Sequence, residues 1–433
     1  MHETKLLNPS PASSIRPAGK PGRPARGSLF FILLILTIFT VSCYPFVTPG
    51  PAAQVQPDPV QSAAIPTRVR AVQTAAPSST ASNFTLAPTH DLSAFLTLTP
   101  MPEIEGLFDF SPNVDPLTGL EVQDPSRLER RPVMVKVSNF PRTGRPHAGL
   151  SFADMVFEYY IGYGLNRFAA IYLGQDASQV GPIRSGRLVD AQLSELYQCI
   201  FVYGNADPTI DEVIVGEIGF RALAERDLPT PPRYRIGPVA ETNLFTNTAE
   251  VTDYVNQQAK VSNGRRDLRG MVFSDLIHPL NQPATEIGVQ FWTTTRGEWH
   301  YDVASGKYLR WIEEPKGETE IEMIPLIDRL TDEQLAFSNV IILFATYEEI
   351  APTKHDIYLY NNKDGKRALY FRDGVMIEGL WKTPHNGRPI QFYNKWNLPM
   401  HLKPGNTWIV LAGDSSKFTE NEPGIWELRF DIP

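Results

Sequence analysis

Charged side chains lie in and beside two apolar runs between Asn139 and Asp190. Burying a charge is costly unless it pairs with an opposite charge or with a ligand. This part of the chain is therefore where we predict a functional site. Its candidate residues, in order along the chain, are Arg145, Asp154, Glu158, Arg167, Arg184, Arg187 and Asp190.

The arginines suggest a binding site for an anion. Arg184 and Arg187 flank Ser185-Gly186 where a helix is expected to begin, and Arg167 opens the second apolar run. Guanidinium groups near the free N–H groups of a helix start suit a carboxylate, sulfate or phosphate. We predict that these three residues and Arg145 form one positive pocket. The alternative is that they pair with nearby carboxylates in a purely structural network.

The acidic residues allow a catalytic interpretation. Glu158 could act as a general acid if burial raises its pKa, with Asp154 or Asp190 as the second carboxylate, as in glycoside cleavage. No metal site or cofactor is predicted. The eight histidines are scattered, and the sequence lacks a phosphate-binding loop, a dinucleotide-binding glycine pattern and a G-x-S-x-G motif.

The elements that must position these residues can be predicted from the apolar pattern. Met155–Ile161 and Phe168–Leu173 are strand-like and are separated by Gly162-Tyr163-Gly164, which predicts a β-hairpin. Apolar residues at helical spacing predict a helix over 186–198, with Ser185 as its cap. Together with further strands and helices, residues 104–275 are predicted to form a mixed α/β domain.

From about Val289 onward the sequence consists of short apolar runs separated by Gly, Asn, Asp and Pro. This pattern is typical of a mostly antiparallel β barrel or sandwich. We therefore predict a second, β-rich domain over residues 286–433, which makes the fold class α+β.

The N-terminus has the pattern of an export signal. Basic residues up to Arg26 precede an apolar run, Leu29–Val41, and Cys43 follows closely. Residues 1–43 resemble a lipoprotein signal in which Cys43 is lipidated; the alternative is an uncleaved anchor. Residues 44–103 are rich in Pro, Ala and Thr and predict a disordered spacer. In both cases the rest of the protein is expected outside the cytoplasm and tethered to the membrane.

The charge balance argues against one class of partner. The net charge is −8, and residues 1–43 contain five basic residues and one acidic residue, so the remainder carries about −12. A general nucleic-acid binder needs a basic face that displaces phosphate counterions. No nucleic-acid partner is therefore predicted.

Several segments, in order, carry a resemblance to one family. The segments are DPLTGL at 115–120, RRPVMVKVSN at 130–139, RPHAGLSFADMVFE at 145–158, GLNRFAAIY at 164–172, GPIRSGR at 181–187, YDVASGKYLR at 301–310, NVII at 339–342, DGVMIEGLWK at 373–382 and LKPGNTWIVL at 402–411. In these segments the chain resembles the YerB-like lipoproteins, also called DUF3048. The resemblance implies a lipoprotein of the cell envelope, but no reaction.

Two functions remain open at this point. One is a non-catalytic lipoprotein whose arginine-bearing cleft binds an anionic envelope ligand or a partner protein. The other is an enzyme that cleaves a cell-wall glycan with Glu158 as general acid or base. A Glu158 that faces an open cleft would favour catalysis, whereas a Glu158 sealed into a pair with an arginine would favour binding.

Overall fold

The computed structural model describes residues 104–432. The predicted signal segment with Cys43 and the predicted spacer, residues 44–103, lie outside the described residues. The chain divides into two compact units, Met1–His90 and Asp91–Pro433, and every described residue belongs to the second. Within residues 104–432, no helix is long and apolar enough to cross a membrane.

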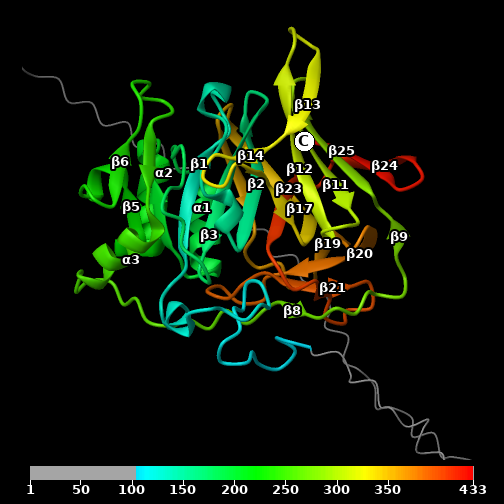
Figure 1. Ribbon diagram of the computed structural model, residues 1–433, viewed down its shortest axis with the longest axis horizontal. Coiled ribbons are helices and arrows are strands. Elements are labelled where there is room, and N and C mark those ends of the chain that lie inside the picture. Colours follow the sequence, from blue (N-terminus) through cyan, green and yellow to red (C-terminus); the bar gives the residue numbers. More distant parts are fainter. Residues whose placement is uncertain (1–103, 433) are drawn as a thin grey trace, which may run out of the picture. The chain divides into compact units, whose positions relative to one another are not determined.

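A 12-stranded sheet runs through the middle of this unit (Figure 1). Two short strands pair with inner strands of this sheet, β18 (Lys354–Tyr358) with β17 and β9 (Gln282–Pro283) with β20. The other ten strands, in spatial order, are β21 (Gln391–Asn394), β20 (Val375–Lys382), β19 (Lys366–Arg372), β17 (Asn339–Ala351), β23 (Thr407–Gly413), β2 (Met155–Gly162), β3 (Leu165–Tyr172), β1 (Val133–Ser138), β4 (Ile200–Tyr203) and β5 (Ala222–Ala224).

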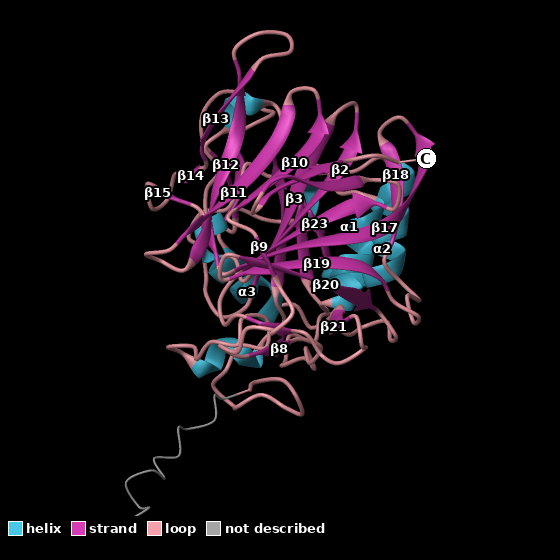
Figure 2. Ribbon diagram, turned by 90° about the vertical axis from the view of Figure 1, so that its right-hand side faces the viewer, coloured by secondary structure: helices cyan, strands magenta, loops and turns pink. Residues whose placement is uncertain are grey.

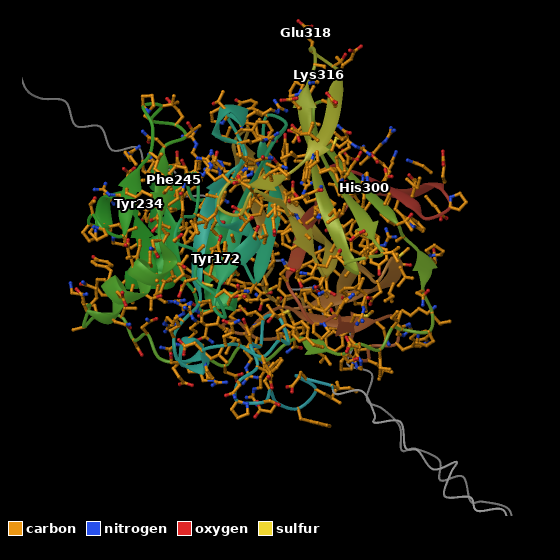
Figure 3. The ribbon with its side chains drawn as sticks, in the orientation of Figure 1. Tyr172, Tyr234, Phe245, His300, Lys316 and Glu318 are labelled. Carbon is orange, nitrogen blue, oxygen red and sulfur yellow. The ribbon has the colours of Figure 1, made fainter. Side chains whose placement is uncertain are left out.

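A second sheet contains seven strands. In spatial order they are β13 (Ile321–Pro325), β12 (Lys307–Pro315), β11 (Thr295–Asp302), β10 (Glu286–Trp292), β25 (Ile425–Arg429) and β24 (Lys417–Glu422), with β16 (Ala336–Phe337) on β12. Three two-stranded ribbons complete the strands: β14 (Ile327–Asp328) with β15 (Glu333–Gln334), β8 (Val272–Phe273) with β22 (His401–Leu402), and β6 (Arg233–Arg235) with β7 (Leu244–Thr246). The β6–β7 ribbon stacks the rings of Tyr234 and Phe245 with their centroids 6.3 Å apart (Figure 3).

Three α-helices are present in the described residues, and their starts follow local chemistry. They are α1 (Leu188–Leu196), α2 (Pro208–Ile218) and α3 (Thr248–Asn256). Helix α2 begins at a proline, and the preceding Asp207 accepts a hydrogen bond from the backbone of Thr209. The predicted Ser185 cap is wrong. Helix α1 begins later, and Asp190 in its first turn accepts a hydrogen bond from the backbone N–H of Arg187 at 2.7 Å. Short 3-10 turns span Pro125–Glu129, Arg142–Gly144, Leu150–Phe152, Gly219–Arg221 and Glu225–Asp227.

The central sheet is covered on both faces, and strand β2 shows how the faces are divided. Met155, Phe157 and Tyr159 belong to the core shared with α1 and α2. Val156 points to the opposite face, into a core that includes residues of the second sheet. Because side chains alternate along a strand, Glu158 shares the face of Val156 and lies between the two sheets. Figure 2 shows α1 and α2 together at one side and strands β10 to β13 at the other.

The two predicted domains share the central sheet. Strand β2 pairs in parallel with β23, so Met155 lies opposite Thr407. The strand-rich content predicted for residues 286–433 is present, but these strands do not close into a barrel of their own. Six of them, β17, β18, β19, β20, β21 and β23, belong to the sheet of the first segment instead. Apolar periodicity identifies strands but not their partners, which explains the difference.

Candidate functional site

Glu158 is sealed between the two sheets. Its carboxylate has no exposed surface and accepts hydrogen bonds from Arg310 Nη2 at 3.2 and 3.3 Å and from Trp408 Nε1 at 2.8 Å. Asn166 Nδ2 donates a further bond at 2.5 Å. Burial raises the pKa of Glu158, and the Arg310 guanidinium opposes that shift. The predicted general acid therefore does not face a cleft in this arrangement.

Arg145 belongs to the same buried network and not to the other predicted arginines. Its Nη2 lies 2.9 Å from Glu313 Oε1, and its Nη1 donates to the Glu313 carbonyl oxygen at 2.7 Å. Its Nε donates to Asn139 Oδ1, and Asn139 in turn donates to Asn166. Arg145 is thus linked to Glu158 through two asparagines, and its hydrogen bonds are made within the protein.

Arg167, Arg184 and Arg187 lie together at the start of α1, and we call them the arginine niche. Arg167 Nη1 and Arg187 Nη1 both donate to the Ser185 carbonyl oxygen, at 2.9 and 3.3 Å. The Arg184 guanidinium makes no hydrogen bond to any residue in the described range. No carboxylate between residues 104 and 432 lies within ion-pairing distance of the three. Each of their Nε atoms is buried and has no partner there.

The electrostatics of the niche favour an added anion. Burial lowers the pKa of Arg167 well below its usual value, and Arg187 and Arg184 lower it further. Burial also lowers the pKa of Arg187. The negative charge of Asp190 opposes this shift, and the positive charge of Arg184 adds to it. Arginine stays protonated in proteins, so these shifts reflect mainly the cost of burying the cations and, to a smaller extent, the repulsion between them. A bound carboxylate, sulfate or phosphate would relieve it.

Asp190 lies behind the niche in a closed cluster. It is fully buried, and its Oδ1 lies 3.1 Å from the ammonium group of the equally buried Lys136. Tyr159 Oη donates to the same oxygen. Burial lowers the pKa of Lys136 to about 7 and raises that of Asp190. Asp190 therefore fixes the start of α1, and with it the position of Arg187.

Asp154 lies elsewhere, at the floor of a cleft of about 610 Å³. Its Oδ2 accepts hydrogen bonds from the backbone of Leu173 and Gly174, and its carboxyl group is within hydrogen-bonding reach of Asp115. Burial raises the pKa of Asp115 to about 6 and that of Asp154 well above its usual value. Two buried carboxyl groups in contact share a proton, because both cannot ionise cheaply.

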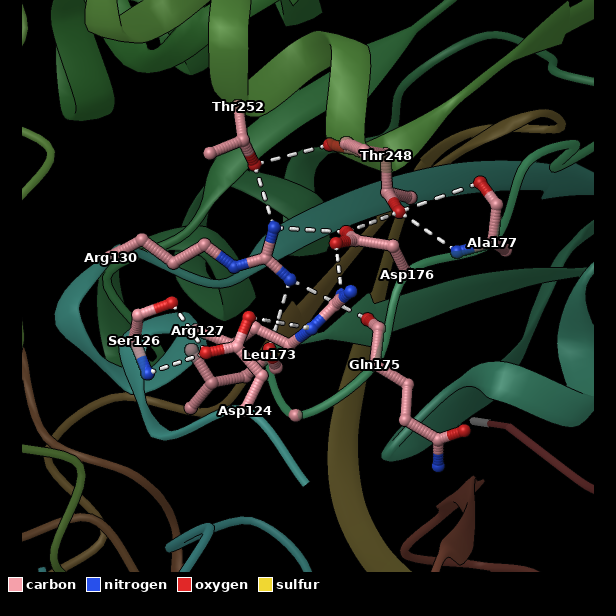
Figure 4. A network of polar contacts seen from close by, with 12 residues as sticks. Asp124, Ser126, Arg127, Arg130, Leu173, Gln175, Asp176, Ala177, Thr248 and Thr252 are labelled. Carbon is pink, nitrogen blue, oxygen red and sulfur yellow. Dashed lines mark hydrogen bonds and ion pairs between the residues drawn. The ribbon is translucent and has the colours of Figure 1, made fainter. Parts of the chain in front are cut away.

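A network of ion pairs holds one wall of this cleft (Figure 4). Arg130 Nη1 lies 2.9 Å from Asp176 Oδ1 and donates to Thr252 Oγ1, while its Nη2 donates to the Leu173 carbonyl oxygen. Arg127 also pairs with Asp176. The network ties the 3-10 turn at Pro125–Glu129 to the end of β3 and to α3, so this wall is rigid.

One group of side chains in the described part of the chain has the spacing of metal ligands. Single ligand atoms of Glu286, Glu298 and His300 lie within 4.8 Å of one another. However, Arg296 Nε lies 2.7 Å from Glu298, and His300 Nε2 lies 3.0 Å from it. A guanidinium already neutralises this carboxylate, so the group does not offer the charge that a divalent cation needs.

Two residues near these sites were not predicted from the sequence. Lys136 lies in the apolar segment VMVKV, and a lone lysine inside a strand was the available signal. Asp115 lies in DPLTGL, which we interpreted only as turn chemistry. Its Oδ1 does accept a turn hydrogen bond from Leu117, but its Oδ2 faces Asp154 and Gly174.

Comparison with known families identifies both halves of the chain. Residues 117–262 match the DUF3048 N-terminal domain and residues 287–409 match the DUF3048 C-terminal domain, both described as of unknown function. The chain belongs to the DUF3048 family. This confirms the resemblance found in the sequence.

This member of the DUF3048 family is similar to a named protein and to a solved crystal structure. It is 30% identical over 326 residues to the protein named "Putative lipoprotein YerB" of Bacillus subtilis (strain 168), covering 69% of this chain and 86% of the relative. It is also similar to the crystal structure of the YerB protein from Bacillus subtilis. That likeness has 27% sequence identity and a TM-score of 0.56, and it covers 69% of this chain and 96% of the other.

Proposed function

We propose that the protein is a membrane-tethered extracytoplasmic lipoprotein that binds an anionic envelope ligand, or an anionic group of a partner protein, through the arginine niche. Tethering through Cys43 is supported by the sequence of residues 1–43 and by the similarity to a protein named as a lipoprotein. The proposed binding residues are Arg167, Arg184 and Arg187. Arg145 is not among them, because Glu313 already holds it.

The observation that carries the proposal is the unbalanced charge of the niche. Elsewhere in the described chain, buried arginines such as Arg310 and Arg145 have carboxylate partners. The three niche arginines have none, although the protein as a whole is acidic. A focused positive patch in an acidic protein concentrates anions locally, while the bulk charge repels them at long range.

Arginine-to-lysine variants test the proposal. Arg184→Lys and Arg187→Lys keep the charge but lose the forked donor geometry. We expect each to weaken binding of Asp91–Pro433 to purified, phosphate-bearing cell-wall polymer by roughly tenfold. The Arg184 variant should keep the parent's melting temperature. Arg367→Lys, at an exposed arginine that pairs with Glu378, is the matched control. Unchanged binding by both niche variants would make the niche structural and reject the proposal.

The cleft supports a second candidate function, which is acid–base catalysis on a cell-wall glycan. The specific observation in its favour is the pair of buried carboxyl groups of Asp115 and Asp154, both with raised pKa values, in the lining of a cleft of about 610 Å³. Glu158 no longer carries this alternative. Incubation with purified glycan strands, followed by analysis for new reducing ends, tests it. Cleavage by the parent and loss of cleavage in Asp154→Asn would support catalysis. Absence of cleavage by the parent would reject this second candidate function.

A further inference from the structure

Large apolar side chains are exposed together at one end of the described unit. Phe108 is 87% exposed and Leu398 is 60% exposed. An exposed apolar cluster on a soluble domain marks an interaction surface. We call this cluster the apolar end; its members are Leu107, Phe108, Leu276, Ile277, Leu280, Trp396 and Leu398.

Contacts between loops make the apolar end continuous. The loop after β8 and the turn after β21 meet where the rings of His278 and Trp396 stack with centroids 5.5 Å apart. On the other side, Leu107 and Phe108 line the same shallow groove as Tyr393 and Pro399. Residues from three separate parts of the chain therefore contribute to one surface.

The turn that presents Trp396 is held in shape from within. Asn394 Oδ1 accepts hydrogen bonds from the backbone N–H groups of Trp396 at 2.9 Å and Leu398 at 3.0 Å. Asn397 between them has a positive φ of 64°, a conformation that asparagine tolerates. The two apolar side chains are thus exposed by a fixed turn, so little ordering entropy is lost when they bind.

The chain also enters the described unit at the apolar end. Glu105 pairs with Phe273 of β8 through backbone hydrogen bonds of 2.9 and 2.8 Å. Figures 1 and 2 both show β8 and β21 at the same end of the described unit. In the sequence, the apolar run Leu29–Val41 and Cys43 precede this point. A membrane attachment at Cys43 would therefore connect to the described unit beside the apolar end.

The chemistry of the apolar end fits a lipid surface. Trp396 is a residue type favoured at the membrane interface, and the Lys395 ammonium lies 4.7 Å from the centre of its ring. Leucine and isoleucine on loop tips can enter the head-group region, while lysine remains at its surface. We infer that the apolar end docks directly on the outer surface of the membrane bilayer. This contact is separate from the lipid anchor and from the arginine niche.

Tryptophan fluorescence with lipid vesicles tests the inference on the compact unit Asp91–Pro433. Among the described tryptophans, Trp292 and Trp396 are the two exposed ones, at 59% and 51%. Trp292 lies beside Gly164, outside the apolar end. Vesicles of phosphatidylethanolamine and phosphatidylglycerol should shift the emission to shorter wavelength. Brominated lipids should quench this signal in the parent and in Trp292→Phe, but not in Trp396→Phe.

Co-sedimentation gives the second measurement. We expect Trp396→Ser combined with Leu398→Ser to lower the vesicle-bound fraction by roughly tenfold or more. The double variant loses the free energy that is gained when these two apolar side chains move from water into the membrane. Val303→Ser, at an exposed apolar residue outside the apolar end, should bind as the parent does. Absence of vesicle binding by the parent would overturn the inference. So would binding that the double variant leaves unchanged, or a soluble dimer in which Trp396 is protected.

Discussion

Removing the Glu158 carboxylate should destabilise the protein strongly. Glu158→Ala leaves Arg310, which is 1% exposed, without its carboxylate, and removes the acceptor of the Trp408 indole. Breaking a buried pair by deleting one partner costs about 3–5 kcal/mol. An unsatisfied buried donor costs about 1–3 kcal/mol, and the two losses overlap. We therefore expect the free energy of unfolding to fall by about 4 kcal/mol, a large part of the ~5–15 kcal/mol typical of a domain.

Urea denaturation of Asp91–Pro433, followed by tryptophan fluorescence, measures this change. Replacing both partners, as in Glu158→Met with Arg310→Met, should recover much of the loss because no buried charge is left unpaired. Glu378→Ala breaks an exposed ion pair and should change stability by at most about 1 kcal/mol. A loss below about 1 kcal/mol for Glu158→Ala would refute the assignment of Glu158 to a structural pair.

Three further predictions concern other residues. The raised pKa of Asp115 means that the folded protein keeps a proton that the unfolded chain loses above about pH 4. The contribution of Asp115 to the free energy of unfolding therefore falls as the pH rises from 4 to 6. The loss is up to about 3 kcal/mol, because the pKa of Asp115 is raised from 3.8 to about 6. Asp115→Asn should flatten that part of the stability–pH curve; an unchanged slope would contradict the shared proton. Arg145→Lys should lower the free energy of unfolding by about 1–3 kcal/mol and leave anion binding intact, since Glu313 is the partner of Arg145. Weaker anion binding by this variant would show that Arg145 takes part in the binding site. Cys43→Ala should abolish acylation measured with a labelled fatty acid, and retained label would exclude lipidation at that position.

Local structure could be predicted from the sequence with good accuracy. The hairpin predicted at Met155–Ile161 and Phe168–Leu173 corresponds to β2 and β3, and the helix predicted over 186–198 corresponds to the shorter α1, Leu188–Leu196. Period-two and period-3.6 apolar patterns, with Gly and Pro between them, contain this information. Of the four arginines grouped from the sequence, Arg167, Arg184 and Arg187 lie near one another, because a hairpin strand and a nearby helix start are close in sequence, whereas Arg145 pairs with Glu313. That the three bind a ligand stays a prediction.

Long-range pairing could not be predicted in the same way. The partner of Glu158 is Arg310, on a strand of the other sheet, and nothing in either local pattern indicates the match. The same limit applies to Asp115 and Asp154, which approach each other because the start of β2 and the end of β3 lie beside the DPLTGL turn. Burial then decides their chemistry, because a carboxyl group in a dry site keeps its proton.

The parallel pairing of β2 with β23 also constrains how the protein reaches its native state. Met155 and Thr407 are roughly 250 residues apart, so this pairing has a very high contact order and forms late. If the chain crosses the membrane from its N-terminus, β2 is outside the cytoplasm well before β23 follows. Until then, the apolar edge of β2 has unpaired backbone groups and is a template for wrong association. An exported protein of this topology would therefore have a vulnerable interval during translocation, which a chaperone outside the cytoplasm would protect.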